Sequence, residues 1–466
     1  MQSRILLAAL ACAFTWPAAA AENPESAKLA AELAALREQI AQMKTAYEGR
    51  IAALEEKLEA ARQEGDATVP TRSGTASASQ APARADARTA AFNPEVSLIL
   101  QGAYKHRKEV EERHIGGFVS ADHHHDDDGH GGDKRGLTLD HSELVLAANI
   151  DPYFRGQATL AVLDSEVELE EAWFQTTALG YGAGIKAGRF LSGIGYLNEQ
   201  HAHQWDFHEQ PLMYRALFGE HGYTQDGVQV KWVAPLATFV EVGVEAGRGQ
   251  NFPGDERNLN GVNSRAVFAH VGGDIGASHS WRAGLSWLQT RAEARASHFE
   301  TESFGEVHGV FSGRSRTWIA DLVYKWAPDG NPARRNLKLQ AEYFQRRESG
   351  HLTAEGDGRT LGESPWRTRQ SGYYIAGVYQ FTPHWRAGLR YDQLHSGRQF
   401  LGDNPAGIET LDDRPRRVSV MVDYNWSEFS RLRLQWARDR AMPGVTDNQV
   451  TLQYVMSLGS HGAHKF

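Results

Sequence analysis

The sequence predicts an all-β membrane protein, an antiparallel transmembrane β-barrel of about 16 strands preceded by an N-terminal α-helical coiled coil. Residues 92–466 hold about 16 segments of roughly ten residues in which apolar and polar side chains alternate, the length and pattern of tilted membrane strands. Beyond residue 21 no run of about 20 apolar residues exists, so no transmembrane helix is available. The net charge of -9 gives no reason to expect nucleic-acid binding.

The first 21 residues have the pattern of a signal peptide. Arg4 precedes an apolar run, and alanines 18–21 form a small-residue cleavage site before Glu22. Cys12 is the only cysteine and lies in this segment, so the mature chain would have no disulfide, thiolate metal site or cysteine nucleophile. The alternative, a lipoprotein signal ending at Cys12, would leave a very short apolar core.

A heptad pattern marks residues 25–64 as a coiled coil. The seam consists of Leu29, Leu33, Leu36, Ile40, Met43 and Tyr47, continued by Ile51, Leu54, Leu58 and Ala61. We expect this narrow apolar stripe to self-associate, with a homotrimer as the expected assembly; the alternative is a single helix that lies on another domain. Residues 66–91 are rich in Ala, Ser, Thr, Arg and Pro without periodicity, which indicates a flexible linker.

Sixteen strands are expected in residues 92–466. Their cores start near Val96, Leu139, Arg155, Val167, Gly184, Val228, Phe239, Ala266, Trp281, Trp318, Leu337, Tyr373, Trp385, Val418, Leu432 and Val450. The alternation is clear over 418–426, where Val and aromatic residues on one face oppose Ser, Met, Asp and Asn on the other. Strands with these charges suit a barrel that has lipid outside and water inside.

The connectors alternate in length. The long ones are expected at about 105–136, 191–225, 249–263, 292–313, 348–369, 396–414 and 439–447. One external connector is shorter, near 164–166, so 191–225 is the third external loop. This third loop is aromatic and semi-apolar, which suggests that it folds into the barrel and packs on the wall. Its polar residues are candidate constriction residues, although they could merely hold the loop in place by hydrogen bonds: Glu199, His201, His203, Asp206, His208 and Glu209.

Several features resemble known outer-membrane families. The closing alternating segment that ends on Phe466 resembles the last strand of bacterial outer-membrane barrels, and the whole architecture resembles trimeric 16-stranded porins, most of all the phosphate-selective group. The runs FNPEVSLIL, SELVLAANID, VELEEAWFQT, GRFLSGIGYLNEQHAHQWDF and SLGSHGAHKF resemble a proteobacterial group labelled zinc-regulated TonB-dependent receptor. The chain departs from that label, since a coiled coil and a linker stand where a plug domain would be.

This resemblance implies the outer membrane of a Gram-negative bacterium as the location. Outer-membrane barrels place short turns in the periplasm and long loops outside, so the N-terminus is expected to be periplasmic. The expected partners are the lipid bilayer, lipopolysaccharide, two further copies of the chain, and peptidoglycan or periplasmic proteins at the coiled coil.

Histidine carries the most specific chemistry. The first external loop holds His123, His124, His125, Asp126, Asp127, Asp128, His130 and Asp133, residue types that bind borderline cations such as Zn²⁺. We expect a loose metal-collecting loop with zinc as the metal and no required cofactor. The alternative is a solvated polar loop.

Charges on the inner face are divided between early and late strands. The early strands offer Glu166, Glu168, Glu170, Glu241 and Glu245. The late strands offer Arg386, Arg390, Arg417, Arg431 and Arg433. Acid and base on opposite walls would set a transverse field across a narrowed pore. These charges could instead be structural pairs.

The function that follows is passive uptake of small hydrophilic solutes through a water-filled channel, with divalent metal captured at the first external loop. The alternatives are a TonB-linked zinc receptor, a phosphate or anion-selective porin, and a non-transporting coiled-coil tether or adhesin. No nucleophile, base and orienting residue stand at a recognisable spacing, so no enzymatic activity is expected.

Overall fold

The computed structural model describes residues 95–459 except 111–112, 120–133, 164–165, 256–259, 302 and 357. The predicted signal peptide, coiled coil, linker and terminal Phe466 lie outside the described residues. The strands are β1 Glu95–His106, β2 Gly136–Leu139, β3 Ser142–Asn149, β4 Phe154–Leu163, β5 Glu166–Thr176, β6 Ala183–Leu191, β7 Thr224–Val233, β8 Phe239–Gly247, β9 Ser264–Ile275, β10 His279–Thr301, β11 Gly305–Trp326, β12 Asn336–Gly356, β13 Arg359–Gln380, β14 Trp385–His395, β15 Arg416–Ser427, β16 Ser430–Arg440 and β17 Asp447–Gly459.

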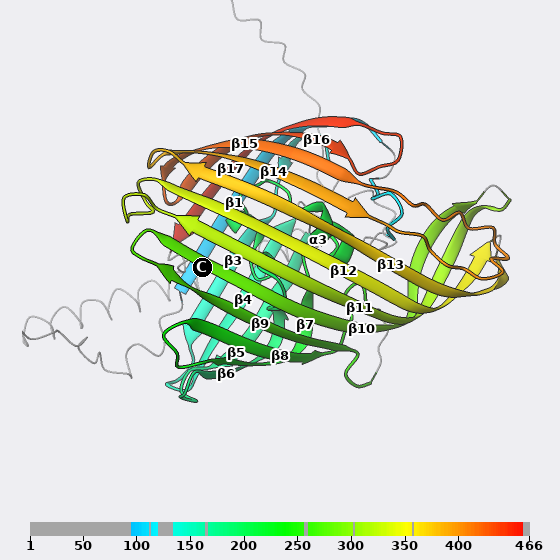
Figure 1. Cartoon of the computed structure of the whole chain (residues 1–466), viewed down its shortest axis with the longest axis horizontal. Helices are drawn as coiled ribbons and strands as arrows, with labels where there is room; N and C mark the ends of the chain where they lie inside the picture. Colours follow the sequence, from blue (N-terminus) through cyan, green and yellow to red (C-terminus); the bar gives the residue numbers. More distant parts are fainter. Residues whose placement is uncertain are drawn as a thin grey trace, which may run out of the picture. The chain divides into compact units, whose positions relative to one another are not determined.

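These strands form one closed antiparallel barrel (Figure 1). Each strand pairs with its neighbours in sequence, and β17 returns to pair with β1 through the register Leu98↔Leu458. The 17 labelled strands occupy 16 positions, because β2 and β3 follow one another along the same edge of β1. The predicted strand number is confirmed, and each predicted strand core falls in its own position.

The outer face of the barrel is apolar and the inner face is polar. On β15, Val420 and Val422 are 40% and 38% exposed, whereas the flanking Ser419 and Asp423 are fully buried inside. Such a face can contact lipid, and closure leaves no strand edge unpaired, as a membrane requires. The chain is therefore a transmembrane barrel of the outer-membrane type.

Aromatic side chains gather near the short-turn end of the strands. Trp385 of β14 meets Tyr424 of β15 with ring centroids 4.8 Å apart, and Trp426 meets Tyr454 of β17 at 6.3 Å. This arrangement is that of the aromatic girdle at a membrane interface. Among the described residues, no helix is long and apolar enough to cross a membrane.

Four strands are much longer than the sequence predicted. β10 to β13 have 21–23 residues each, and Figure 1 shows them running on past their neighbours at the long-loop end. The predicted loops at 292–313 and 348–369 are therefore wrong, since most of these residues are strand.

A cluster of buried apolar side chains at the long-loop end explains why these segments remain strands. Phe311, Leu352 and Trp366 alternate inward and are buried against Leu401 and Ile408 of the connection between β14 and β15. The polar and apolar alternation that marks the membrane strands continues outside the membrane, because a half-buried sheet needs the same pattern.

Candidate functional site

The connection between β6 and β7, residues 192–223, lies inside the barrel and is called loop 3. It contains a 3₁₀ turn, Ala202–Gln204, and the helix α3, Leu212–Phe218, drawn behind β12 and β13 in Figure 1. Its apolar side chains are fully buried against the wall, Leu212 and Leu217 among them, in one core with Phe344 and Leu394. Packing of this kind explains why the loop is so rich in aromatic and aliphatic residues.

Two wall carboxylates hold the start of loop 3. Glu245 accepts hydrogen bonds from Ser192 Oγ at 2.5 Å and from the Gly193 N–H at 2.9 Å. Glu342 accepts from the Tyr196 N–H at 2.9 Å and from Tyr214 Oη at 2.8 Å. The loop is thereby fixed where it enters the lumen.

Gly195 is required at this point. Its φ of 68° lies in the left-handed region, and a Cβ there would stand 2.6 Å from Glu342 Oε2 and 2.5 Å from Tyr214 Oη. Only glycine lets the backbone approach the carboxylate this closely.

The predicted late-strand arginines all face loop 3. Two of them donate to loop carboxylates, Arg386 to Asp206 and Arg417 to Glu209. The other three donate to backbone carbonyls of the loop: Arg390 to Glu209, Arg431 to His203 and Arg433 to Trp205. The distances from these guanidinium nitrogens to the loop oxygens are 2.6–3.1 Å. We call these five residues the arginine wall. Its donors are used to anchor the loop.

Asp206 of loop 3 pairs with two cations of the wall. Lys338 Nζ lies 2.7 Å from its Oδ2 and Arg386 lies 3.0 Å from its Oδ1. Burial disfavours the charged carboxylate, but these two cations outweigh burial and hold the pKa of Asp206 well below its usual range.

The part of the wall formed by β3 and β5 places carboxylates side by side through two irregularities. In β5, Thr159 pairs with Glu171 and Leu160 with Leu169, so Glu170 is an extra residue, and Glu170 and Glu171 are both largely buried. Such a bulge interrupts the alternation of inward and outward side chains along β5. Glu168 is exposed, and the side chain of Glu166 is not described.

The second irregularity separates β2 from β3. Gly102 of β1 pairs with Leu139 and Ile99 with Glu143, so three steps on β1 match four steps on the partner. Because of the extra residue, Glu143 reaches His203 of loop 3, and His141 reaches Glu170, a carboxylate on β5. Neither residue was among the predicted site residues.

Loop 3 meets this wall through His201 and His203. His201 Nε2 lies 3.0 Å from Glu171 Oε2, and its Nδ1 lies 3.3 Å from Glu170 Oε2 and 3.5 Å from Glu143 Oε2. His203 Nδ1 lies 3.0 Å from the other oxygen of Glu143, and the two imidazoles stack with centroids 6.1 Å apart. The two histidines lie on the same side of loop 3, since His201 is the N-cap of the 3₁₀ turn and His203 lies within it.

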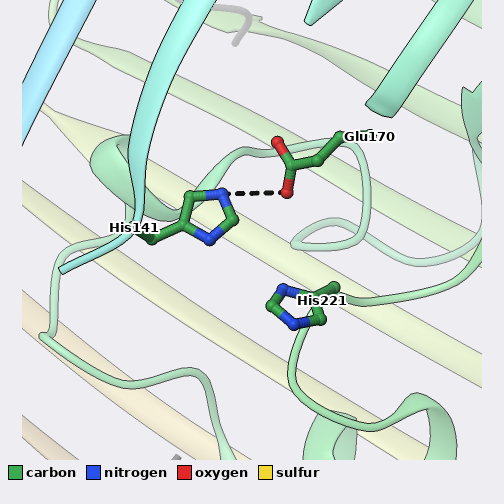
Figure 2. Close-up of side chains that lie close together, drawn as sticks. All are labelled: His141, Glu170 and His221. Atoms are coloured by element: carbon green, nitrogen blue, oxygen red, sulfur yellow. Dashed lines mark ion pairs between the residues drawn. The ribbon is translucent and has the colours of Figure 1, made fainter. Parts of the chain in front are cut away.

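His141 and His221 form a second pair of neighbouring histidines, which lies nearer to solvent. His141 Nε2 lies 2.9 Å from Glu170 Oε1, and the exposed His221 ring lies 5.6 Å from the His141 ring (Figure 2). Two sets of three ligand atoms, each within 4.8 Å of one another, follow from this arrangement. We call Glu143, Glu170 and His201 the inner triad, and His141, Glu170 and His221 the outer triad. Glu170 belongs to both.

The carboxylates affect the charge of His201, which lies in loop 3 outside the membrane-spanning strands. Burial opposes a positive imidazole, but Glu143, Glu170 and Glu171 outweigh burial and raise the pKa of His201 well above its ordinary value. The site therefore attracts positive charge.

The remaining predicted residues have separate partners. His208 Nε2 lies 2.8 Å from Asp140, and Glu241 lies 2.9 Å from Lys231 and 3.2 Å from His270. Glu199 is half-buried on loop 3. The predicted metal-collecting residues His123, His124, His125, Asp126, Asp127, Asp128, His130 and Asp133 lie outside the described residues.

Little open space remains in the described lumen. Inner-face side chains are mostly below 10% exposed even when charged, for example Arg282 and Asp321. A small open pocket lies beside loop 3 at the long-loop end, with Arg107, Arg113 and Arg215 in its lining. In this conformation loop 3 and the wall side chains fill most of the cross-section.

A comparison of sequences assigns the family. A protein of Aquifex aeolicus (strain VF5) described as uncharacterized is 33% identical over 405 residues, which cover 81% of this chain and 80% of that protein. The chain belongs to the same family as this protein. No protein-family model matches the chain.

Solved structures with likeness to the barrel include three outer-membrane proteins. They are a loop-deletion mutant of OmpT of Vibrio cholerae (12% identity, 78% of this chain, 99% of that chain, TM-score 0.49), the channel DcaP of Acinetobacter baumannii (13%, 78%, 97%, 0.44) and an anion-selective porin of Comamonas acidovorans (12%, 78%, 99%, 0.46). Values this low carry no functional inference for the chain.

Proposed function

We propose that the chain forms a passive channel for small hydrophilic solutes, with loop 3 as its constriction. The observation that carries this proposal is the position of loop 3, which crosses the lumen and is held by polar contacts to two walls of opposite charge. A barrel that served only as a membrane anchor would have no use for a polar inner face arranged around a loop.

Loop 3 can be displaced without breaking the barrel. Its contacts to the arginine wall are hydrogen bonds and ion pairs, which water can replace, whereas the strands are held by their own continuous ladder. Partial release of the loop on this side would open a water path beside it. The pocket at the long-loop end would be the outer mouth of that path.

Divalent metal is the proposed solute class, with zinc the leading candidate. Support comes from the imidazoles and carboxylates of residues 123–133 and from the histidines and carboxylates that line loop 3. The pocket lined by arginines favours anions as the second candidate solute class.

Liposome swelling tests the channel proposal. The full-length protein in liposomes should admit small sugars and exclude larger ones, because the described lumen is narrow. A folded barrel that admits no solute of any size would support the tether and contradict the channel. Reversal potentials in salt gradients then separate cation from anion preference.

A further inference from the structure

The inner triad has the geometry of a metal site. Its ligand atoms are Glu143 Oε2, Glu170 Oε2 and His201 Nδ1, and Nδ1 stands 3.5 Å and 3.3 Å from the two oxygens. Ligands of a tetrahedral zinc ion with bonds of about 2.0–2.2 Å lie about 3.3–3.5 Å apart. Both distances from the nitrogen match two edges of such a site, and the two oxygens lie within 4.8 Å of one another.

The two oxygens of this triad face only the His201 ring nitrogen among the partners found for them in the described residues. Glu143 is fully buried, and neither its Oε2 nor Glu170 Oε2 accepts a well-directed hydrogen bond from the described residues. A buried carboxylate oxygen without a partner is costly, because it has lost its water. Two such oxygens that converge on one ring nitrogen form a set of ligand atoms that a cation would satisfy.

A second ring of contacts orients the ligands. Glu171 Oε2 lies 3.0 Å from His201 Nε2, and its other oxygen accepts the Leu191 N–H at 3.0 Å. A carboxylate that accepts the hydrogen bond of one ring N–H orients the other nitrogen toward the metal, which displaces the proton from that nitrogen on binding. His203 and His141 likewise hold the second oxygens of Glu143 and Glu170.

We propose that the inner triad binds one zinc-class divalent cation and that the outer triad, with its exposed His221, is where the ion enters. One imidazole and two carboxylates, with a fourth position for water, suit zinc better than calcium or magnesium, which prefer oxygen ligands only. The bound ion would connect β3, β5 and loop 3. As a statement about what this channel recognises, the proposal rests on the proposed function.

Zinc calorimetry on full-length protein in detergent tests the site. The background variant carries His123→Ala, His124→Ala, His125→Ala and His130→Ala, so that the first external loop does not contribute. This background should bind one zinc ion per chain. His201→Ala or Glu143→Gln should lower the affinity by about 100-fold or more, because each removes a ligand. Anomalous diffraction at the zinc edge should place the ion among the three ligand atoms.

Two further variants make the result specific. Glu241→Gln removes another lumen carboxylate that pairs with a histidine, 3.2 Å from His270, and should leave zinc binding unchanged. Glu171→Gln keeps all three ligands and should cost about 10–100-fold through the orientation of His201. If His201→Ala fails to fold, Glu171→Gln decides the question.

The outcomes separate the two proposals. Equal zinc binding by the background and the ligand variants, or no zinc bound by the background, overturns the metal site. If liposome swelling is then intact, the channel stands without it. If zinc binds as described but no solute passes, the channel is refuted while the metal site stands.

Discussion

At the scale of single residues, simple alternation predicts most of the inner face and fails at two places. Arg386, Glu245 and the histidines of loop 3 were predicted because their types and positions are visible in the sequence. His141 and Glu143 were missed, because the extra residue between β2 and β3 shifts the period, and tertiary pairing with β1 sets that shift. The polar run 140–143 inside an apolar segment was the available signal.

Acid is expected to loosen loop 3 through Asp206. Its pKa is lowered in the folded protein, so its contribution to stability is present above its unfolded pKa of about 3.9 and is lost as pH falls through the folded value. Channel conductance should therefore stay constant between about pH 5 and 6, where Asp206 is ionised and His201 is protonated, and rise below about pH 4.

Asp206→Asn is the matched variant for this prediction. It removes the carboxylate that pairs with Lys338 and Arg386, so conductance at neutral pH should exceed that of the wild type and the acid response should shrink. An unchanged acid response in the variant would show that other carboxylates control the loop.

At the scale of elements, strand positions were predictable and strand lengths were not. Each membrane strand shows its alternation locally, which is why all 16 positions were found. The ends of β10 to β13 share that alternation with loops of similar composition, and only their packing around Trp366 makes them strands. Long-range contacts of this kind cannot be recognised from the local sequence.

The first external loop is expected to collect divalent metal independently of the lumen. Replacing His123, His124, His125 and His130 by Ala should lower the amount of zinc retained by the whole protein, because these imidazoles are zinc ligands. Conductance should remain nearly intact, since this loop need not line the constriction. Equal zinc retention by the variant and the wild type would end this part of the account.

At the scale of the whole molecule, the barrel combines a rigid closed wall with one inner loop held between opposite charges. The acidic side, Glu143, Glu170 and Glu171, faces the histidines of loop 3, and the arginine wall faces its carboxylates and carbonyls. Acidic side chains thus gather on β3 and β5 and arginines on β14 to β16, and loop 3 contacts both groups. A single sequence cannot show how completely the polar groups of one loop pair with the charges of the two walls.

Assembly is expected to depend on residues 25–64. Replacing Leu33, Leu36 and Ile40 with Asp places charge in the heptad seam and should convert a cross-linked trimer to smaller species without unfolding the barrel. Cross-linking of the wild type measures this directly, and heat-modifiable gel mobility checks that the barrel is folded. A wild type that cross-links only as a monomer would contradict the trimer.

The central claim is that loop 3 is the constriction of a channel, and single-channel conductance tests it most directly. A chain that lacks residues 199–216 loses His201, His203, His208, Asp206 and most of α3 while all strands remain. Its conductance should be several-fold larger than that of the wild type, because the material that fills the lumen has been removed. A correctly folded deletion variant with the same conductance as the wild type would contradict the claim.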